Sequence, residues 1–410
     1  MRLKSFSRPT RVIVACTVGN AVSITPMVYT VFGMFLIPIA TEFAWPRAAV
    51  SFSLLVVALA SALGYPIIGR LIDRYGARPV ILAGNVLFAA AVGCASMVGA
   101  SRLELYLIYG LIGIAGAIPS SVMFTKVIAG WFDRGRGFAM GIAGGVGNGV
   151  GAALSPLLVG ALLAHYGWRG SYVGIAAVIL LIGFPVLFLL LRDPPSSYND
   201  VAAGPAVASG MTLGQARSTS TFWIILVAIA VGAGCMTAVF AHVVPLLLDH
   251  GFSEQRATAV LATFATVTAV WQVGVGRLID RIPRPWIAAP FYLAALVGLI
   301  LFQAAASFSQ LLLAGAFMGL GLGTEYGVLP YFLSRYFGVR HYGAISGMIY
   351  AVIVLAQGLT PFLMDLSFDR SGSYHSSIVV IGAGLIVSAL LILRLRPFAA
   401  VAMAGGRQKS

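Results

Sequence analysis

The sequence predicts an all-α polytopic membrane protein with twelve transmembrane helices in two six-helix bundles. Its composition is 60% hydrophobic and 9% charged, whereas soluble domains carry roughly 25% charged residues. The apolar residues fall into about twelve runs, each near the ~20 residues that a helix needs to cross a bilayer. The hexapeptide Gly69-Arg-Leu-Ile-Asp-Arg74 returns about half the chain later as Gly276-Arg-Leu-Ile-Asp-Arg281. A charged loop repeated at this distance indicates a duplicated bundle.

The expected spans follow one another with short loops, so neighbours in the sequence are expected to be antiparallel neighbours in the membrane. The runs are too continuous for the alternating strands, ~10 residues long, of a membrane β-barrel. The spans cover residues 12–38, 48–69, 79–99, 103–127, 138–164, 171–191, 221–248, 256–276, 286–306, 310–333, 343–366 and 376–394.

The basic residues are distributed unequally between the two sides of this topology. With the N-terminus inside, 21 of the 26 Lys and Arg residues fall on the inner side. The outer side holds only Arg47, Arg102, Arg169, Arg256 and Arg370. Because cytoplasmic loops carry an excess of Lys and Arg, we expect both termini in the cytoplasm. The net charge of +14 then reflects membrane orientation and does not indicate a nucleic-acid partner.

One long polar stretch divides the chain. Residues 193–220 are rich in Pro, Ser, Ala and Gly, which is typical of a flexible linker. The expected organisation is therefore an N-terminal bundle at 1–192, a cytoplasmic linker at 193–220, a C-terminal bundle at 221–396 and a cytoplasmic tail at 397–410. A second repeat supports duplication, since an aromatic pair, basic residues and a glycine-rich helix follow one another from Trp131 and again from Tyr336.

This pattern resembles the major facilitator superfamily over nearly the whole chain. The loop signature of that superfamily matches Gly69, Leu71, Asp73, Arg74, Gly76 and Arg78. The second copy keeps Gly276, Leu278, Asp280 and Arg281 and then diverges. Within the superfamily the chain looks most like the monocarboxylate transporter and oxalate/formate exchanger group. The motifs that carry this likeness begin at Trp131, at Phe32 and at Arg335.

Asp73 and Asp280 lie at the ends of expected helices, each among arginines. A carboxylate there can accept charge-assisted hydrogen bonds from arginine or from N–H groups at a helix start. The resemblance implies that Asp73 faces the other half near helix eleven and that Asp280 faces the start of helix five. These contacts would lock the cytoplasmic side in one state and break in the other. The alternative is a solvated basic loop that only sets topology. The expected gate comprises Gly69, Asp73, Arg74, Gly76, Arg78, Arg134, Arg136, Asp280, Arg281 and Arg340, with the arginines at 134, 136 and 340 as partners of the aspartates.

Charged groups at membrane depth are costly and are candidates for function. Glu325 is the only acidic residue near the middle of an expected span. The resemblance places it in a cavity-lining helix, where a carboxyl can exchange a proton or contact a polar substrate. The alternative is a structural carboxyl bonded to neighbouring helices. Lys126 can bind an anion or extend its amine to the cytoplasmic interface. His242 can titrate or form a structural hydrogen bond.

Several uncharged side chains can donate hydrogen bonds to a solute, although each alone is more often a helix–helix contact. They are Gln272, Tyr29, Tyr326, Tyr350, Asn148 and Gln357. In the group that the chain resembles, a substrate-binding arginine in helix eight aligns with Gln272, and a lysine in helix eleven aligns near Ile349 and Tyr350. An amide supplies no charge, so Gln272 suits a neutral or zwitterionic substrate better than a compact anion.

These residues predict a secondary transporter, not an enzyme, that moves a small organic solute with protons by alternating access. The resemblance implies a symporter for a monocarboxylate or related organic acid. One alternative is an efflux pump or exchanger for a neutral or aromatic compound, and another is a transporter-like solute receptor. We expect a monomer in the plasma or inner membrane, with the lipid bilayer, the solute and protons as partners and with no nucleic acid. No cofactor or metal is expected, since Cys16, Cys94 and Cys235 all fall in apolar helices as small core residues.

Overall fold

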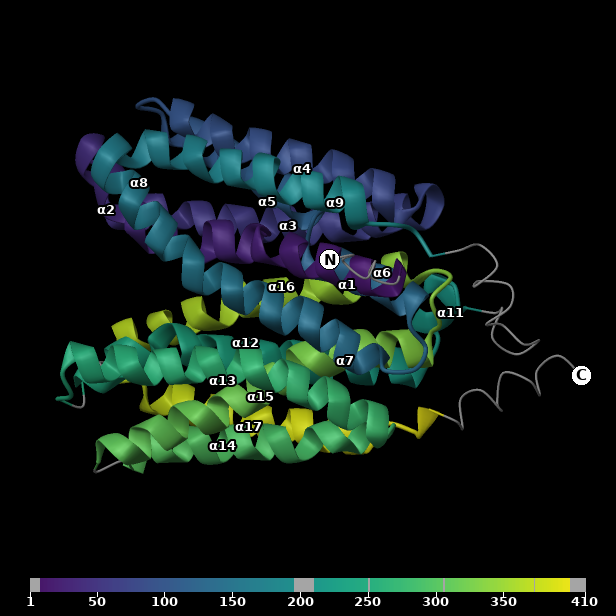
Figure 1. Ribbon diagram of the computed structural model, residues 1–410. Coiled ribbons are helices and arrows are strands. Elements are labelled where there is room, and N and C mark those ends of the chain that lie inside the picture. Colours follow the sequence, from purple (N-terminus) through teal and green to yellow (C-terminus); the bar gives the residue numbers. More distant parts are fainter. Residues whose placement is uncertain (1–7, 195–209, 250, 305–306, 372, 399–410) are drawn as a thin grey trace, which may run out of the picture. The chain divides into compact units, whose positions relative to one another are not determined.

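The computed structural model describes residues 8–194, 210–249, 251–304, 307–371 and 373–398, which form helices joined by short connections (Figure 1). Residues 195–209 of the expected linker, residues 399–410 of the expected tail, and the basic residues Arg2 and Lys4 lie outside the described residues. The described residues contain eleven helical segments long and apolar enough to cross a membrane. One of these, Arg136–Leu190, is 55 residues long.

That long segment contains two spans. Gly167 has φ 63° and ψ −175°, values outside the helical region. The chain reverses there because glycine adopts a positive φ without a steric cost. The structure therefore has twelve spans within its described residues, which confirms the predicted all-α, twelve-helix fold.

The chain forms two compact units. The first comprises Met1–Asp133, Ile142–Ala203 and Val339–Ala351. Up to Asp133, its helices are α1 (Arg8–Ala21), η1 (Thr25–Tyr29), α2 (Phe32–Glu42), α3 (Arg47–Tyr75), α4 (Ala77–Cys94), η2 (Ala95–Met97), α5 (Arg102–Ala117) and α6 (Ser121–Trp131). The remaining ones are η3 (Ile142–Val146), α8 (Gly147–Val178), η4 (Ile179–Gly183) and α9 (Phe184–Leu190). The start of α16 (Tyr342–Ser371) belongs to the same unit.

The second unit comprises Arg134–Gly141, Gly204–Gly338 and Val352–Ser410. It contains the remainder of α16 and the short α7, which precedes η3 in the sequence. Its helices are α7 (Arg136–Gly141), α11 (Leu213–Arg217), α12 (Ser220–Asp249), α13 (Glu254–Arg281), η5 (Pro285–Ala288), α14 (Ala289–Ala304), α15 (Phe308–Tyr336) and α17 (His375–Leu393).

Two spans of the first unit are interrupted, although their apolar pattern is continuous. The first span divides into α1, η1 and α2, with Pro26 near the start of η1. The fourth span divides into α5 and α6, and Pro119 lies in the gap. Proline has no N–H and cannot continue the backbone ladder of a preceding helix. Non-helical backbone at membrane depth needs internal hydrogen-bond partners, so polar side chains are expected near both breaks.

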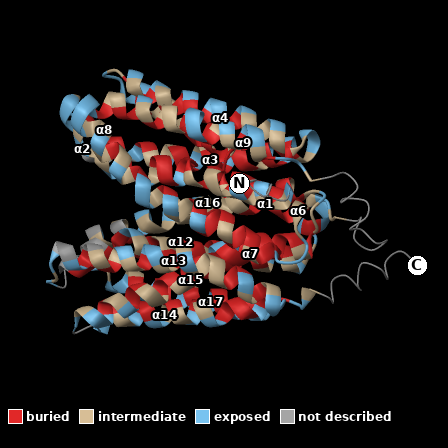
Figure 2. Ribbon diagram, in the orientation of Figure 1, coloured by how far each residue is buried: buried red, intermediate tan, exposed pale blue. Residues whose placement is uncertain are grey.

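A stripe of glycines brings α15 close to α13 in the second unit. Gly315, Gly319, Gly323 and Gly327 recur every four residues and therefore share one face of α15. A Cβ atom added at Gly319 would lie 2.8 Å from the carbonyl oxygen of Phe264, and one added at Gly323 would lie 2.6 Å from that of Thr268. Small residues permit this backbone approach. Figure 2 shows the buried residues that result along α15.

Gly76 makes the turn between α3 and α4. Its φ of 88° is in the region that favours glycine. The next two N–H groups, of Ala77 and Arg78, donate to Asp193 Oδ1 at 2.8 and 3.0 Å. Asp193 therefore caps the start of α4, and the end of the sixth span is tied to the turn that carries the loop signature.

Candidate functional site

Asp280 binds the start of α7. Its Oδ1 accepts a hydrogen bond from Gly137 N–H at 3.0 Å, and its Oδ2 accepts one from Phe138 N–H at 2.8 Å. These N–H groups belong to the first turn of a helix and have no partner within it. The aligned peptide dipoles also favour a negative charge at this end. The carboxylate thus joins the end of α13 to the start of α7.

Asp73 makes the same contact in the first unit. Its Oδ1 and Oδ2 accept hydrogen bonds from Gly343 N–H at 3.1 Å and Ala344 N–H at 2.8 Å, at the start of α16. Gly69, one turn earlier on α3, lies against the same segment, and a Cβ atom added to it would lie 2.5 Å from the carbonyl carbon of Gly343. The repeated hexapeptide therefore forms the same geometry twice.

Lys126 pairs with Asp73 through its side-chain amine. The two side chains are only 15% and 12% exposed, and Lys126 also interacts electrostatically with Asp193. The amine therefore reaches a carboxylate near the end of α3. An opposite charge already lies within reach inside the unit, and pairing there satisfies both groups.

The arginines of the expected gate lie elsewhere. The aspartate contacts that the structure describes run to helix N–H groups and, for Asp73, to Lys126. Arg134 and Arg340 are exposed, while Arg136 is buried. The guanidinium of Arg74 lies over the Tyr75 ring at 5.3 Å.

Two further arginines of the expected gate, Arg78 and Arg281, also lie away from the aspartate contacts. Arg78 Nη2 donates to the carbonyl oxygen of Phe188 at 3.0 Å. Arg281 is exposed at the end of α13. In the described part of the chain, both aspartates instead bind the N–H groups at a helix start.

Glu325 is buried in the interior of the second unit, 1% exposed. Its Oε2 accepts a hydrogen bond from the Tyr292 hydroxyl on α14 at 3.3 Å. Its Oε1 has no hydrogen-bond partner among the residues that the structure describes. A Cβ atom added at Gly232 of α12 would lie 3.0 Å from Oε2. Because an unpaired buried charge is strongly unfavourable, these surroundings accommodate the protonated carboxyl.

Glu325 and Gln272 do not share a site. Gly323 and Gly327 both contact the backbone around Gln272 on α13. At 100° per residue, Glu325 lies about 200° around α15 from Gly323, on the opposite face. The helix backbone therefore separates the buried carboxyl from the amide-bearing helix.

Tyr326 and Gln357 form an accessible polar pair. Gln357 Nε2 donates to the Tyr326 hydroxyl at 3.2 Å, and Tyr326 is 38% exposed. Tyr326 follows Glu325 directly, yet one side chain is accessible and the other is enclosed. This pair offers neutral hydrogen-bonding groups to a solute.

Asn148 belongs to a network beside the helix breaks of the first unit. Its Nδ2 donates to Ser121 Oγ at 3.0 Å, and its Oδ1 accepts a hydrogen bond from Ser23 Oγ at 3.4 Å. The Ser121 hydroxyl donates to Asn20 Oδ1. Ser23 and Ser121 both lie next to the interruptions, so this network supplies polar partners to the first, fourth and fifth spans where their backbone is irregular.

Tyrosines gather near the same unit's interrupted first helix. The rings of Tyr65 and Tyr350 have centroids 6.4 Å apart. Tyr29, at the end of η1, lies near Tyr65. Tyr29 and Tyr350 are each partly exposed, whereas Tyr65 is buried. The sequence prediction named Tyr29 and Tyr350 and missed Tyr65.

His242 has a structural environment. Its Nδ1 lies 2.8 Å from the carbonyl oxygen of Ala238, one turn earlier, and its ring makes an edge contact with Tyr374 at 5.5 Å. It is 5% exposed. No group of three or more His, Cys, Asp and Glu side chains that could hold a metal ion occurs in the described part of the chain.

Sequence reasoning also missed Asp193 and Tyr292. The sequence prediction places Asp193 in the linker, although the two prolines that follow it are a common signal for the end of a helix. Tyr292 is a buried aromatic residue in an apolar helix, and nothing in its local sequence distinguishes it from a core residue.

Comparison with known proteins decides the family. A family model described as Major Facilitator Superfamily matches residues 18–361 and 242–408. The chain belongs to the major facilitator superfamily. This superfamily member is 27% identical to Monocarboxylate transporter 13 of Bos taurus over 373 residues, which cover 90% of this chain and 85% of that protein. It is 30% identical to Monocarboxylate transporter 11 of Homo sapiens over 347 residues, covering 80% of this chain and 70% of that protein.

A solved structure supports the same fold. A crystal structure of a variant of the E. coli fucose:proton symporter FucP aligns with a TM-score of 0.69 and 16% identity over 95% of this chain and 100% of that chain. The predicted superfamily and its monocarboxylate transporter group are confirmed. These relatives are transporters and not enzymes, so this multi-span membrane protein is a solute transporter.

Proposed function

We propose that this superfamily member is a secondary active symporter that moves a small monocarboxylate or related organic acid together with protons. The substrate class follows from the names of the relatives, which are monocarboxylate transporters similar over 80–90% of this chain. The driving ion is assigned to protons because Glu325 is a buried carboxyl with no ion pair among the described residues. The domains are taken as 1–192 and 221–396, with a linker at 193–220 and a tail at 397–410.

The observation that carries alternating access is the repeated aspartate contact. Asp73 and Asp280 each bind two N–H groups at a helix start, with donor–acceptor distances between 2.8 and 3.1 Å. Such a contact forms or breaks as a whole, because both oxygens face one rigid helix end. Two-state contacts of this kind suit a protein that opens to one side of the membrane at a time.

Glu325 suits a proton site for a physical reason. The protonated carboxyl can donate through one oxygen and accept the Tyr292 hydrogen bond through the other. Loss of the proton leaves a charge among α12, α14 and α15, which is unfavourable unless the packing changes or water enters. Protonation is thereby linked to the packing of the second unit, and a linked equilibrium is what proton coupling requires.

A second candidate, efflux or exchange of a neutral or aromatic compound, has its own support. Gln272 stands where the resembling group has an arginine, and the accessible pair Tyr326 and Gln357 is uncharged. Neutral amides and phenols bind carbonyl, hydroxyl and aromatic groups without requiring an anion.

The test uses the purified full chain in proteoliposomes. Uptake of radiolabelled lactate and pyruvate is measured with an inward proton gradient and again after the gradient is collapsed with a protonophore. Gradient-dependent accumulation above the external concentration supports the proposal. Accumulation of aromatic or neutral solutes with no response to monocarboxylates favours the second candidate, and binding in a thermal-shift screen without any flux favours a solute receptor.

Localisation and assembly complete the proposal. The excess of basic residues on one side supports a cytoplasmic location for both termini. We assign the protein to the plasma or inner membrane as a monomer. Its partners are the solute, protons and lipid. Labelling of single cysteines introduced at Arg74 and Arg281 tests the topology, since both should react only from the cytoplasmic side.

A further inference from the structure

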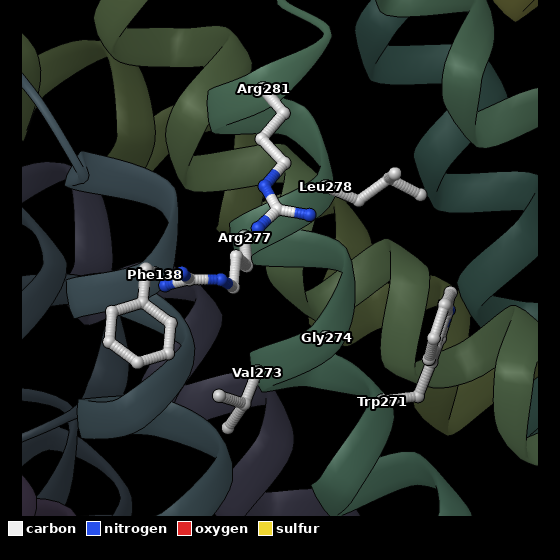
Figure 3. A pocket seen from close by; sticks show the side chains of 7 residues that line it. All are labelled: Phe138, Trp271, Val273, Gly274, Arg277, Leu278 and Arg281. Carbon is white, nitrogen blue, oxygen red and sulfur yellow. The ribbon is translucent and has the colours of Figure 1, made fainter.

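A pocket lies in the second unit between α7 and the last turns of α13 (Figure 3). Its volume is about 230 Å³. Most of its wall is apolar, and two arginines lie at one end, as the close view shows. The lining residues are Phe138, Trp271, Val273, Gly274, Arg277, Leu278 and Arg281.

The pocket extends along the last turns of α13 to the end of its apolar span. α13 forms a span that ends at Arg281. Trp271 lies ten residues before that end, or about 15 Å at the rise of an α-helix. The apolar part of the pocket is therefore inside the span, and its basic part is at the interface, where lipid phosphates lie. Aromatic and basic residues take these positions at membrane surfaces.

The two arginines have no competing partner. Arg277 and Arg281 are exposed, and neither has a hydrogen bond or ion pair with any residue in the described part of the chain. Arg277 lies over the ring of Phe138 at 5.3 Å. The nearest acidic group in the sequence, Asp280, already binds Gly137 and Phe138 N–H groups. The pocket end thus carries two positive charges with no internal neutralisation.

We propose that this pocket binds an anionic phospholipid, with the phosphate on Arg277 and Arg281 and an acyl chain against Trp271 and Leu278. Arginine pairs with phosphate through a planar fork of donors, and basic pockets between spans on one side of the membrane suit anionic headgroups. The cavity is smaller than the roughly 300–1,000 Å³ of sites that enclose small molecules. An occupant that remains partly in the bilayer fits it better than a soluble one.

The site is also connected to the aspartate contact. Phe138 forms one wall, and its N–H group is the donor to Asp280 Oδ2. When α7 leaves α13, that wall leaves the pocket. A lipid that needs both walls therefore binds preferentially to the conformation in which the Asp280 contact is intact.

Tryptophan fluorescence tests the proposal on the full chain in vesicles, without solute or pH gradient, so that the transport function does not affect the result. One set contains phosphatidylcholine with a fixed mole fraction of phosphatidylglycerol brominated on its acyl chains. The other set contains the same amounts of both lipids. In it, phosphatidylglycerol is unbrominated and an equal mole fraction of phosphatidylcholine carries the bromine. Subtracting the signal of Trp271→Phe isolates quenching at Trp271. We expect brominated phosphatidylglycerol to quench Trp271 about twofold more than brominated phosphatidylcholine.

Variants assign the effect to the arginines. Arg277→Gln with Arg281→Gln should remove the excess quenching, while the lysine versions of both should retain most of it. Arg70→Gln with Arg74→Gln removes the same charge from the first copy of the hexapeptide and should retain the excess. Thermal unfolding of each variant confirms that it is folded.

Four results would overturn the proposal. Equal quenching by the two brominated lipids would show that Trp271 has no preference for phosphatidylglycerol. Burial of Trp271 by a second copy of the chain would give the same result. Excess quenching that survives removal of both pocket arginines excludes them as ligands. An equal loss in the Arg70 and Arg74 variant indicates general surface charge. Relief of the excess by inorganic phosphate identifies a soluble anion as the occupant.

Discussion

The backbone of Gly276 on α13 lies directly against that of Gly137 on α7. A Cβ atom added at Gly276 would lie 2.7 Å from the Gly137 carbonyl carbon and 3.2 Å from Phe138 N. Gly69 and Gly343 stand in the same relation in the first unit. The glycine thus brings the two backbones together, and the aspartate one turn later binds the exposed N–H groups. Both parts of the repeated hexapeptide serve one contact.

Gly276→Ala should therefore destabilise the contact. The added methyl group meets backbone, which cannot rotate away, and such overpacking costs about 1–3 kcal/mol. The thermal unfolding midpoint in detergent should fall. Gly33→Ala is the matched control, since a Cβ atom there has no neighbour within 4 Å. Equal midpoints for the two variants would show that the close approach has no energetic role.

Asp280→Asn should open the α7–α13 contact selectively. The amide keeps one acceptor but loses the charge, and hydrogen bonds to charged groups contribute about 1.5–3 kcal/mol. Hydrogen–deuterium exchange should become faster in residues 134–141. Asp73→Asn should instead raise exchange in residues 339–347. A variant that changed both segments equally would argue against two independent contacts.

The sequence was sufficient for the fold because length and apolarity alone decide whether a segment can cross a bilayer. Two features were beyond it. The breaks near Pro26 and Pro119 lie within continuous apolar runs, and proline in a membrane helix can also cause only a kink. α7 belongs to the second unit and the start of α16 to the first. This assignment depends on tertiary packing, and no local sequence pattern indicates it.

The sequence predicted where the residues of the candidate site lie better than it predicted which groups they bind. The repeat located Asp73 and Asp280, but their arginine neighbours suggested ion pairs where the structure has helix N–H donors. Lys126 is 53 positions from its partner, so no local pattern could join them. The sequence does contain a signal for the direction in which Glu325 points, although the prediction did not use it. The glycines of α15 at intervals of four residues mark its packed face and place Glu325 on the opposite one.

Glu325→Gln should abolish pH-gradient-driven accumulation while leaving exchange of labelled for unlabelled solute. Glutamine keeps the shape and can still accept the Tyr292 hydrogen bond, but it cannot release a proton. Proteoliposome uptake with and without a gradient, beside counterflow at equal pH, separates the two activities. Tyr292→Phe, which retains the carboxyl, should keep gradient-driven uptake. Unchanged proton dependence in Glu325→Gln would remove this residue from the coupling step.

Gln272→Arg should strengthen binding of small carboxylates. The guanidinium adds a charge-assisted, bidentate donor, and a gain of about 1.5–3 kcal/mol corresponds to roughly ten- to hundredfold in affinity. A thermal-shift titration with lactate measures it. Gln272→Glu, which introduces the opposite charge, should weaken the same binding. If affinity is the same in all three proteins, Gln272 does not line the solute path.

Lys126 and Asp73 should be energetically coupled. Removing the amine in Lys126→Met leaves Asp73 with its two N–H partners but without a neutralising charge, in a setting where both side chains are less than one-sixth exposed. Asp73→Asn removes the charge that the amine needs. Because each single change leaves an unpaired group and the double change leaves none, the double variant should be more stable than the sum of the single effects predicts, by about 1–3 kcal/mol. Thermal unfolding of the four proteins gives this coupling. The parallel cycle with Asp193→Asn should give a smaller value, since Asp193 interacts with Lys126 without a direct ion pair. A lysine whose amine lies at the lipid surface would instead give additive effects in both cycles.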